Sequence, residues 1–231
     1  MPIEYKTAVP WGRSFEEYCR MFDLSESDLD QRILGCGDGP ASFNAEMTRQ
    51  KRIVISCDPL YAFSASQIRQ RIDETFDEVM AQTQENQHKF IWNSIESLKT
   101  LGQIRMKAMA DFLDDYEAGR AEGRYLDAEL PALPLKNGSF DLALCSHFLF
   151  LYSDNLSLDF HVASLLEMSR VAREVRVFPI LDYNANPSPH LDPAMNRLKE
   201  KGLTATVQTV PYEFQKGGNR MLRIQAGCDS D

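Results

Sequence analysis

The pattern of apolar and polar residues along this chain alternates between short apolar runs and longer helical repeats. Nearly continuous apolar runs such as residues 32–36 (RILGC) and 52–57 (RIVISC) are typical of strands in a parallel sheet, where both faces are covered. Such runs predict seven strands, at residues 32–36, 52–57, 124–128, 139–146, 174–181, 203–210 and 221–225. The sequence therefore predicts an α/β fold: a doubly wound, mostly parallel seven-stranded sheet with a C-terminal antiparallel hairpin.

Helices are expected between the strands wherever apolar residues recur every three or four positions. Such repeats occur at residues 40–49, 67–81, 89–116, 158–172 and 193–201. A crossover between parallel strands needs only one helix, so residues 64–120 contain a helical insertion. It forms a lid, a wall of a binding site, or a plain packing element. No linker or repeat divides the chain, and we expect residues 1–231 to form a single domain.

Residues 1–31 precede the first strand and are expected to form a helical lead-in. Ser14 and Glu17 have the spacing of a capping box ahead of an amphipathic run, and a second short helix is expected near Ser25. This segment either covers the loop after the first strand, with Trp11 and Arg13 near a ligand, or only packs on the sheet.

The charge of the chain bears on its partners. The formal net charge is −9, and acidic residues are concentrated at residues 111–129, where we expect a solvated helix face and loop. Phosphate backbones are bound by clusters of Lys and Arg, and the sequence has no such cluster. Nucleic acid is therefore not an expected partner.

The cysteines and apolar runs bear on the compartment. Five scattered cysteines without a C-x-x-C pair fit neither a disulfide framework nor a zinc site, so we expect a cytoplasmic protein without a metal. Cys36, Cys57 and Cys145 stand in apolar runs, where buried thiols are expected. The chain begins without a signal-peptide pattern, and its apolar run at residues 142–152 is too short for a bilayer. A membrane partner is not expected.

A glycine-rich loop follows the first predicted strand. It contains Gly35, Gly37 and Gly39 in the segment RILGCGDG, and Pro40 is expected to open the next helix. Glycines at alternate positions leave the backbone open to a ligand, because they carry no Cβ atom. The segment is either the first half of a nucleotide-type site or a tight strand-to-helix turn.

Polar residues also follow the other predicted strands. Asp58 ends the second strand, is followed by Pro59, and stands 21 residues after Gly37. This interval is close to the ~20 residues at which an acid meets ribose hydroxyls in dinucleotide sites. The ends of the third and fourth strands carry Asp127, Ala128, Ser146 and His147. All these residues are expected at the carboxyl edge of the sheet, where such folds bind ligands.

These motifs resemble those of the class I S-adenosylmethionine-dependent methyltransferases. The family's apolar strand with Gly-x-Gly-x-Gly matches the glycine loop, and its acid after the second strand matches Asp58. Its pattern of acid-Ala, Leu-Pro, turn and Phe-Asp matches residues 127–147 (DAELPALPLKNGSFDLALCSH). The glycine spacing disfavours a nicotinamide-dependent oxidoreductase, which has Gly-x-Gly-x-x-Gly. The resemblance covers residues 30–226 and implies an enzyme that uses S-adenosylmethionine to methylate a small-molecule acceptor.

The resemblance also implies which residues meet the cofactor. The glycines face its methionine and ribose, Asp58 the ribose hydroxyls, and Asp127 with the Ala128 backbone the adenine edge. The backbone of Ser146 approaches the methionine end. The alternatives are that Asp127 caps a loop, that Ser146 ends a strand and that Asp58 caps the next helix. The cofactor site predicted in this way comprises Gly35, Cys36, Gly37, Gly39, Asp58, Pro59, Asp127, Ala128 and Ser146.

His147 is the candidate general base. It follows the fourth strand at the methionine side of the site, and an unperturbed imidazole pKa near 6.5 suits proton transfer. Tyr152 and His161 are the substitutes. The alternative for His147 is a packing role beneath the site.

One departure from the family pattern keeps a second function open. Many members carry an acid two residues before the first glycine, and this chain has Ile33 there. The methionine amino group would then meet water, Asp38 or backbone. The Asn/Asp-Pro-Pro-Tyr motif of amino-group methylating members is absent, and SHFLFLY stands in its place. The alternative function is a non-catalytic S-adenosylmethionine-binding or regulatory protein.

Overall fold

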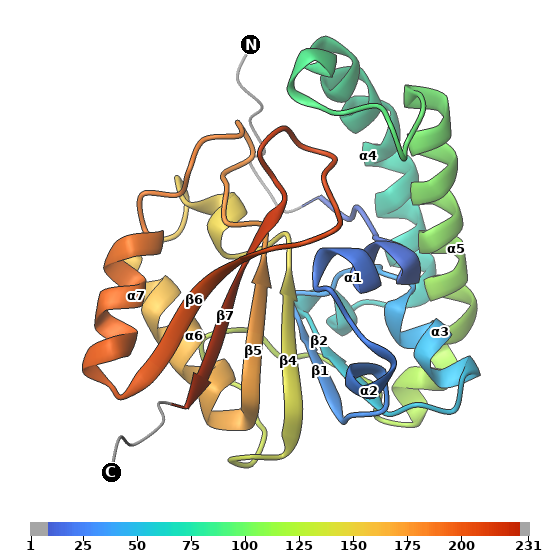
Figure 1. Ribbon diagram of the computed structural model, residues 1–231. Helices are drawn as coiled ribbons and strands as arrows, with labels where there is room; N and C mark the ends of the chain where they lie inside the picture. The colour runs from blue at the N-terminus through green and yellow to red at the C-terminus, as the bar shows by residue number, and fades with distance from the viewer. Residues whose placement is uncertain (1–8, 227–231) are drawn as a thin grey trace.

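The fold is a seven-stranded sheet with helices on both faces. The computed structural model describes residues 9–226, and its strand order is β3-β2-β1-β4-β5-β7-β6 (Figure 1). The strands are β1 (Ile33–Cys36), β2 (Val54–Cys57), β3 (Tyr125–Leu126), β4 (Phe140–Ser146), β5 (Ala172–Phe178), β6 (Leu203–Thr209) and β7 (Arg220–Ala226). The first five are parallel, and β7 runs antiparallel to both β5 and β6. The predicted fold class is confirmed.

Two apolar layers cover the sheet, because neighbouring residues of a strand face opposite sides. Ile33 of β1 packs with the lead-in and α3, whereas Leu34 packs with α6 and α7. This explains why the strand sequences are apolar almost throughout. The α-helices are α1 (Phe15–Met21), α2 (Glu26–Leu29), α3 (Phe43–Arg49), α4 (Ala65–Glu85), α5 (Leu98–Ala121), α6 (Leu158–Val171) and α7 (Leu191–Glu200).

Two predicted helix starts were wrong. α3 begins at Phe43 and not at Pro40, because Gly37 and Gly39 take positive φ and Ser42 N–H donates to the Arg13 carbonyl (3.1 Å). The helix predicted at residues 89–116 begins only at Leu98. Residues 90 and 91 are instead paired with residues 214 and 215 of the β6–β7 connection, so long-range backbone pairing overrides the helical pattern there.

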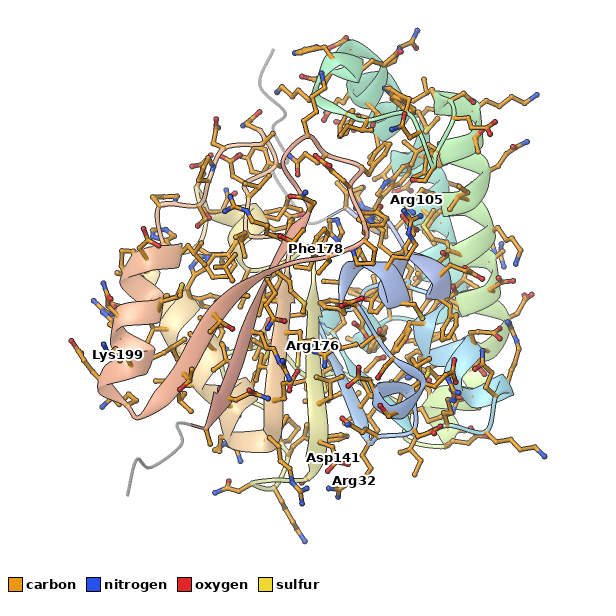
Figure 2. The ribbon with its side chains drawn as sticks, in the orientation of Figure 1. Arg32, Arg105, Asp141, Arg176, Phe178 and Lys199 are labelled. Atoms are coloured by element: carbon orange, nitrogen blue, oxygen red, sulfur yellow. The ribbon has the colours of Figure 1, made fainter. Side chains whose placement is uncertain are left out.

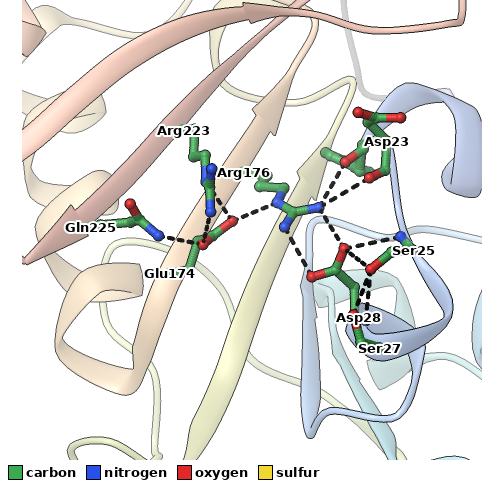
Figure 3. Close-up of polar contacts among 9 residues, drawn as sticks. Asp23, Ser25, Ser27, Asp28, Glu174, Arg176, Arg223 and Gln225 are labelled. Atoms are coloured by element: carbon green, nitrogen blue, oxygen red, sulfur yellow. Dashed lines mark hydrogen bonds and ion pairs between the residues drawn. The ribbon is translucent and has the colours of Figure 1, made fainter.

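The lead-in is fixed to the sheet by a buried arginine. Arg176 of β5 donates to the Phe22 carbonyl (2.9 Å) and pairs with Asp28 of α2 (3.0 Å). Glu174 on the same strand accepts from Arg176 (2.6 Å) and from Arg223 of β7 (2.7 Å), as Figure 3 shows. A buried guanidinium needs such partners, because desolvation penalises unpaired charge. The lead-in is thereby held against the centre of the sheet.

A second buried ion pair joins the lead-in to the insertion. Arg105 of α5, labelled in Figure 2, is 1% exposed and forms a two-pronged ion pair with Glu17 of α1, with Nη2 2.7 Å from Oε1. The Tyr212 hydroxyl from the β6–β7 connection donates to the same carboxylate (2.7 Å). Burial alone would raise the pKa of Glu17, but the Arg105 guanidinium lowers that pKa to about 2.

We expect Arg105→Met to lower the free energy of unfolding by about 3–5 kcal/mol, because Glu17 is left as a buried, unpaired charge. The double variant Glu17→Gln with Arg105→Met should recover part of this loss. The matched control is Arg49→Met, which breaks an exposed pair with Glu46 and should cost at most about 1 kcal/mol. Urea denaturation of the four proteins measures these differences. Equal losses for Arg105→Met and Arg49→Met would contradict the prediction.

Candidate active site

The loop between β1 and α3 has a backbone that only glycine adopts without strain. Gly37 and Gly39 have φ of 66° and 53°. A Cβ atom at Gly37 would lie 3.1 Å from the Phe148 side chain, which follows β4. At Gly35 a Cβ atom would instead overlap the Asp38 carboxyl group at 1.7 Å. Gly35 therefore makes room for a side chain of the protein itself, and Gly37 lies where the loop faces β4.

Asp58 stands where the sequence predicted it, at the end of β2 beside this loop. One carboxylate oxygen accepts from Gly39 N–H and the other from Leu60 N–H, both at 2.8 Å. Asp58 thus caps a short 3₁₀ helix, Pro59–Ala62, which is the alternative role that the sequence suggested for it. Burial raises the pKa of its carboxyl group, and the two N–H donors oppose that shift. Each oxygen keeps a further lone pair with which to accept a ligand hydroxyl.

The glycine loop and Asp58 both line one cavity, which has a volume of about 680 Å³. Its walls come from the lead-in, the ends of β4 and β5, the start of α4 and the β6–β7 connection. Aromatic side chains dominate them, among them Trp11, Phe63, Phe148, Tyr152, Phe178 and Phe214. A concave, largely apolar cavity with a few polar groups is the usual form of a small-molecule site.

The structure brings most of the predicted site residues to this cavity. Those that line it are Gly37, Gly39, Asp58, Pro59, Ser146 and His147. Gly35 and Cys36 lie beneath the loop in β1, and Asp127 and Ala128 follow β3 outside the lining. Asp127 is exposed, although β3 pairs with β2 one residue before Asp58. Its role at an adenine edge stays a prediction.

Arg13 contributes a cation to the wall of the cavity. Its Nη1 donates to the Trp11 carbonyl (2.6 Å), its buried Nε has no partner, and no carboxylate of residues 9–226 lies within 4.0 Å of it. Burial lowers the pKa of Arg13 to about 10, with Arg105 adding to the shift, so Arg13 remains charged at neutral pH. Glu17 is paired with Arg105, another arginine of the cavity wall.

His147 also lines the cavity, in an unusual backbone conformation. Its φ is 52°, its N–H donates to the Phe178 carbonyl (2.6 Å), and its Nδ1 lies 2.9 Å from the Ser146 hydroxyl. Burial lowers the pKa of His147 well below 6.5, and the guanidiniums of Arg13 and Arg105 lower it further. His147 thus differs from an unperturbed imidazole, and the two cations involved come from distant parts of the chain.

The two substitutes for His147 differ in position. Tyr152 lines the cavity. His161 of α6 is fully buried outside it, and its ring nitrogens lie 2.8 Å and 3.0 Å from the carbonyls of Ser157 and Leu149. His161 is thus engaged in the packing of α6 and does not reach a ligand.

Asp38 and Tyr18 are further polar groups of the cavity wall. The Asp38 carboxylate is 7% exposed and accepts from the hydroxyls of Tyr18 (2.9 Å) and Ser56 (2.6 Å). Burial raises the pKa of Asp38 to about 6, and the Asp58 charge contributes to this rise. The sequence marked Tyr18 only as part of an apolar helix face and gave no signal for Ser56.

Within residues 9–226, no helix is long and apolar enough to cross a membrane. The same residues contain no group of three or more His, Cys, Asp or Glu side chains placed to hold a metal ion. Cys19, Cys36, Cys57 and Cys145 are free thiols, and Cys228 lies outside the described residues.

Comparison with known proteins gives one relative in sequence and several in fold. No protein-family model matches the chain. The uncharacterized protein MJ0045 of Methanocaldococcus jannaschii is 31% identical over 224 residues, which are 96% of this chain and 98% of that protein. The order of the strands, with β7 antiparallel, is that of the class I S-adenosylmethionine-dependent methyltransferases. The chain therefore has the fold that the sequence resemblance implied.

Solved structures with similar folds are much more distant in sequence. Magnesium protoporphyrin IX methyltransferase from Synechocystis PCC 6803 is 11% identical, with a TM-score of 0.46 over 87% of this chain and 73% of that one. A putative S-adenosyl-L-methionine-dependent methyltransferase from Methanococcus maripaludis is 10% identical, with a TM-score of 0.47 over 94% and 84%. These values are too low to transfer any residue or ligand to this chain.

We expect the His147 imidazole to stay neutral from neutral pH down to well below pH 6.5, since burial and two cations disfavour the imidazolium. An NMR titration of the imidazole resonances measures this, with His147 assigned from the spectrum of His147→Gln. Arg13→Gln should move the midpoint upwards by removing one cation. A midpoint at or above 6.5 in the parent protein would refute the prediction.

Proposed function

We propose that this chain, which belongs to the same family as the uncharacterized protein of Methanocaldococcus jannaschii, is an S-adenosylmethionine-dependent methyltransferase with a small-molecule acceptor. The observation that carries the proposal is the meeting of the Gly37–Gly39 loop and the Asp58 carboxylate in one cavity of about 680 Å³. The cavity opens at the carboxyl ends of β1, β2 and β4, where open α/β sheets bind their ligands.

The residues of the cavity match the chemical groups of this cofactor. Asp58 has lone pairs for the ribose hydroxyls, beside a loop that Gly37 keeps open. Arg13 supplies the positive charge that a methionine carboxylate would neutralise. When bound, the cofactor supplies an electrophilic methyl group on a sulfonium. Asp127 and Ala128 are proposed for the adenine edge, just beyond the lining beside Asp58.

A small acceptor fits the rest of the cavity. Its aromatic walls suit an apolar or flat molecule, and the start of α4 with Phe63 closes one side. We therefore propose that the insertion at residues 64–120 forms the acceptor wall within a single domain. The net charge of −9 argues against nucleic acid as the acceptor.

The residues required for chemistry are few. Methyl transfer from a sulfonium is an in-line displacement with a good leaving group, so holding acceptor and methyl group in line supplies much of the rate. An acceptor that must lose a proton also needs a base, and we propose His147 for that step, with Tyr152 as the second candidate. The alternative is a non-catalytic binding protein of the same fold, which would bind the cofactor and transfer no methyl group.

Calorimetric titration with S-adenosylmethionine, S-adenosylhomocysteine and NAD tests the proposal. We expect binding of the first two and none of NAD. A screen of metabolites with a labelled methyl donor then separates the enzyme from the binding protein. Failure of both adenosyl compounds to bind would overturn the proposal, and binding without any labelled product would favour the alternative.

We expect Gly37→Ala to weaken S-adenosylmethionine binding at least about tenfold, because the added Cβ atom enters the gap between the loop and Phe148. The matched control is Gly123→Ala, at a glycine with φ of 76° and no atom within 4 Å of the added Cβ. Both should lower the free energy of unfolding by about 1–2 kcal/mol through left-handed strain. Only Gly37→Ala should change the affinity, and equal affinities would remove the loop from the site.

Asp58→Ala and Arg13→Gln should respond differently to two ligands. S-adenosylhomocysteine carries both ribose and amino-acid carboxylate, whereas methylthioadenosine carries only the ribose. A hydrogen bond to a charged group contributes about 1.5–3 kcal/mol, so each loss weakens binding about tenfold or more. Asp58→Ala should weaken both ligands, and Arg13→Gln only S-adenosylhomocysteine. Equal weakening of both ligands by Arg13→Gln would contradict the carboxylate assignment.

A further inference from the structure

The segment that follows Asp58 turns two apolar side chains towards the cavity. Its 3₁₀ helix, Pro59–Ala62, ends where Phe63 N–H donates to the Leu60 carbonyl (3.1 Å). In a 3₁₀ helix, side chains three residues apart lie on the same side. Leu60 and Phe63 accordingly both line the cavity, whereas Tyr61 between them is buried among aromatic residues of α5 and β3.

The backbone of this segment is held in place from its inner side. The Tyr61 hydroxyl donates to the Gly39 carbonyl (2.8 Å), which ties the short helix to the glycine loop. The Tyr116 hydroxyl of α5 is within hydrogen-bond distance of two carbonyls, that of Tyr61 (3.0 Å) and that of Phe63 (2.8 Å). Asp58 caps the first turn. The position of Phe63 is therefore fixed before any ligand binds, which reduces the cost of ordering this wall.

The side chain of Phe63 is exposed although its backbone is fixed. Phe63 is 49% exposed, and Ile53 is the other large apolar residue of the described part of the chain that is exposed. Ile53 precedes β2 and does not line the cavity, whereas Phe63 does. An aromatic ring at this place offers a face on which a flat ligand can stack, and covering its apolar surface favours binding.

The order of groups along this wall matches the order of groups in a nucleoside. Asp58 comes first and has lone pairs for ribose hydroxyls. Leu60 and Phe63 follow, one 3₁₀ turn apart, which is a rise of about 6 Å. A planar base on a ribose held by Asp58 would lie against them. Neither side chain has a polar atom, so this part of the wall can contact the face of a base but cannot hydrogen-bond to its edge.

We propose that Leu60 and Phe63 form a base shelf for a bound nucleoside, with the Phe63 ring stacked on the face of the base. That the nucleoside is S-adenosylmethionine rests on the proposed function. Stacking on an aromatic side chain is possible for every base, so the shelf supplies affinity and does not select adenine. Selection is left to groups at the edge of the base, for which Asp127 and Ala128 are proposed.

Calorimetric titration with methylthioadenosine and S-adenosylhomocysteine tests the base shelf. Phe63→Ala should weaken both ligands by the same factor, about 5–150-fold, which is the usual range for loss of a base–aromatic stack. Phe63→Tyr retains the ring and should bind both within about twofold of the parent protein. Phe63→Leu retains apolar volume and should lose the hypochromism of the adenine absorption band that stacking produces in the parent complex.

The matched control is Ile53→Ala, which removes the other exposed apolar side chain, at the opposite end of β2 from Asp58. It should leave both affinities unchanged. Parent-like affinities of Phe63→Ala for both ligands would overturn the base shelf and leave the proposed function intact. A parent protein that binds methylthioadenosine through Phe63 but neither S-adenosylhomocysteine nor S-adenosylmethionine would support the shelf and overturn the proposed function. Binding of none of the three compounds would overturn both.

Discussion

The buried carboxylate of Asp38 is the constraint on which the site depends. A carboxylate taken out of water is costly unless hydrogen bonds replace its hydration, and the Tyr18 and Ser56 hydroxyls supply them. The group fits only because Gly35 has no Cβ atom. The Asp38 side chain thus joins the loop after β1 to Ser56 of β2, which lies 18 residues later in the sequence. It also joins this loop to Tyr18 of α1, which lies 20 residues earlier.

The lead-in forms one wall of the cavity, and buried charged groups hold it in place as well. Two buried arginines fix it, Arg176 from the sheet and Arg105 from the insertion. Its own Arg13 lines the same cavity as Arg105, which is paired with Glu17. Burial and the charges of Arg13 and Arg105 lower the pKa of His147, and we propose that a ligand carboxylate binds beside Arg13. Binding an anion there should therefore also stabilise the fold, since the folded state alone presents the site.

The sequence predicted the features that depend on local pattern. All seven strands and the positions of Gly37 and Asp58 at one edge of the sheet followed from periodicity and spacing, whereas Arg13 near the cavity was one of two alternatives for the lead-in. Prediction from the sequence failed where segments that are far apart in the sequence contact each other. Residues 90 and 91 pair with the β6–β7 connection, and the two cations that lower the His147 pKa, Arg13 and Arg105, lie 134 and 42 positions before it in the sequence. Contacts between such distant residues leave no periodic signal, so neither the start of α5 nor the His147 pKa could be predicted.

The backbone conformation of His147 bears on the choice between an enzyme and a binding protein. Here His147 is held at a φ of 52°, a conformation that costs a non-glycine residue about 1–3 kcal/mol, and its Nδ1 lies 2.9 Å from the Ser146 hydroxyl. Such cost is retained where the surroundings over-determine a residue, as they do at active sites. The arrangement favours an acceptor that loses a proton, because an acceptor with a free lone pair would need only orientation.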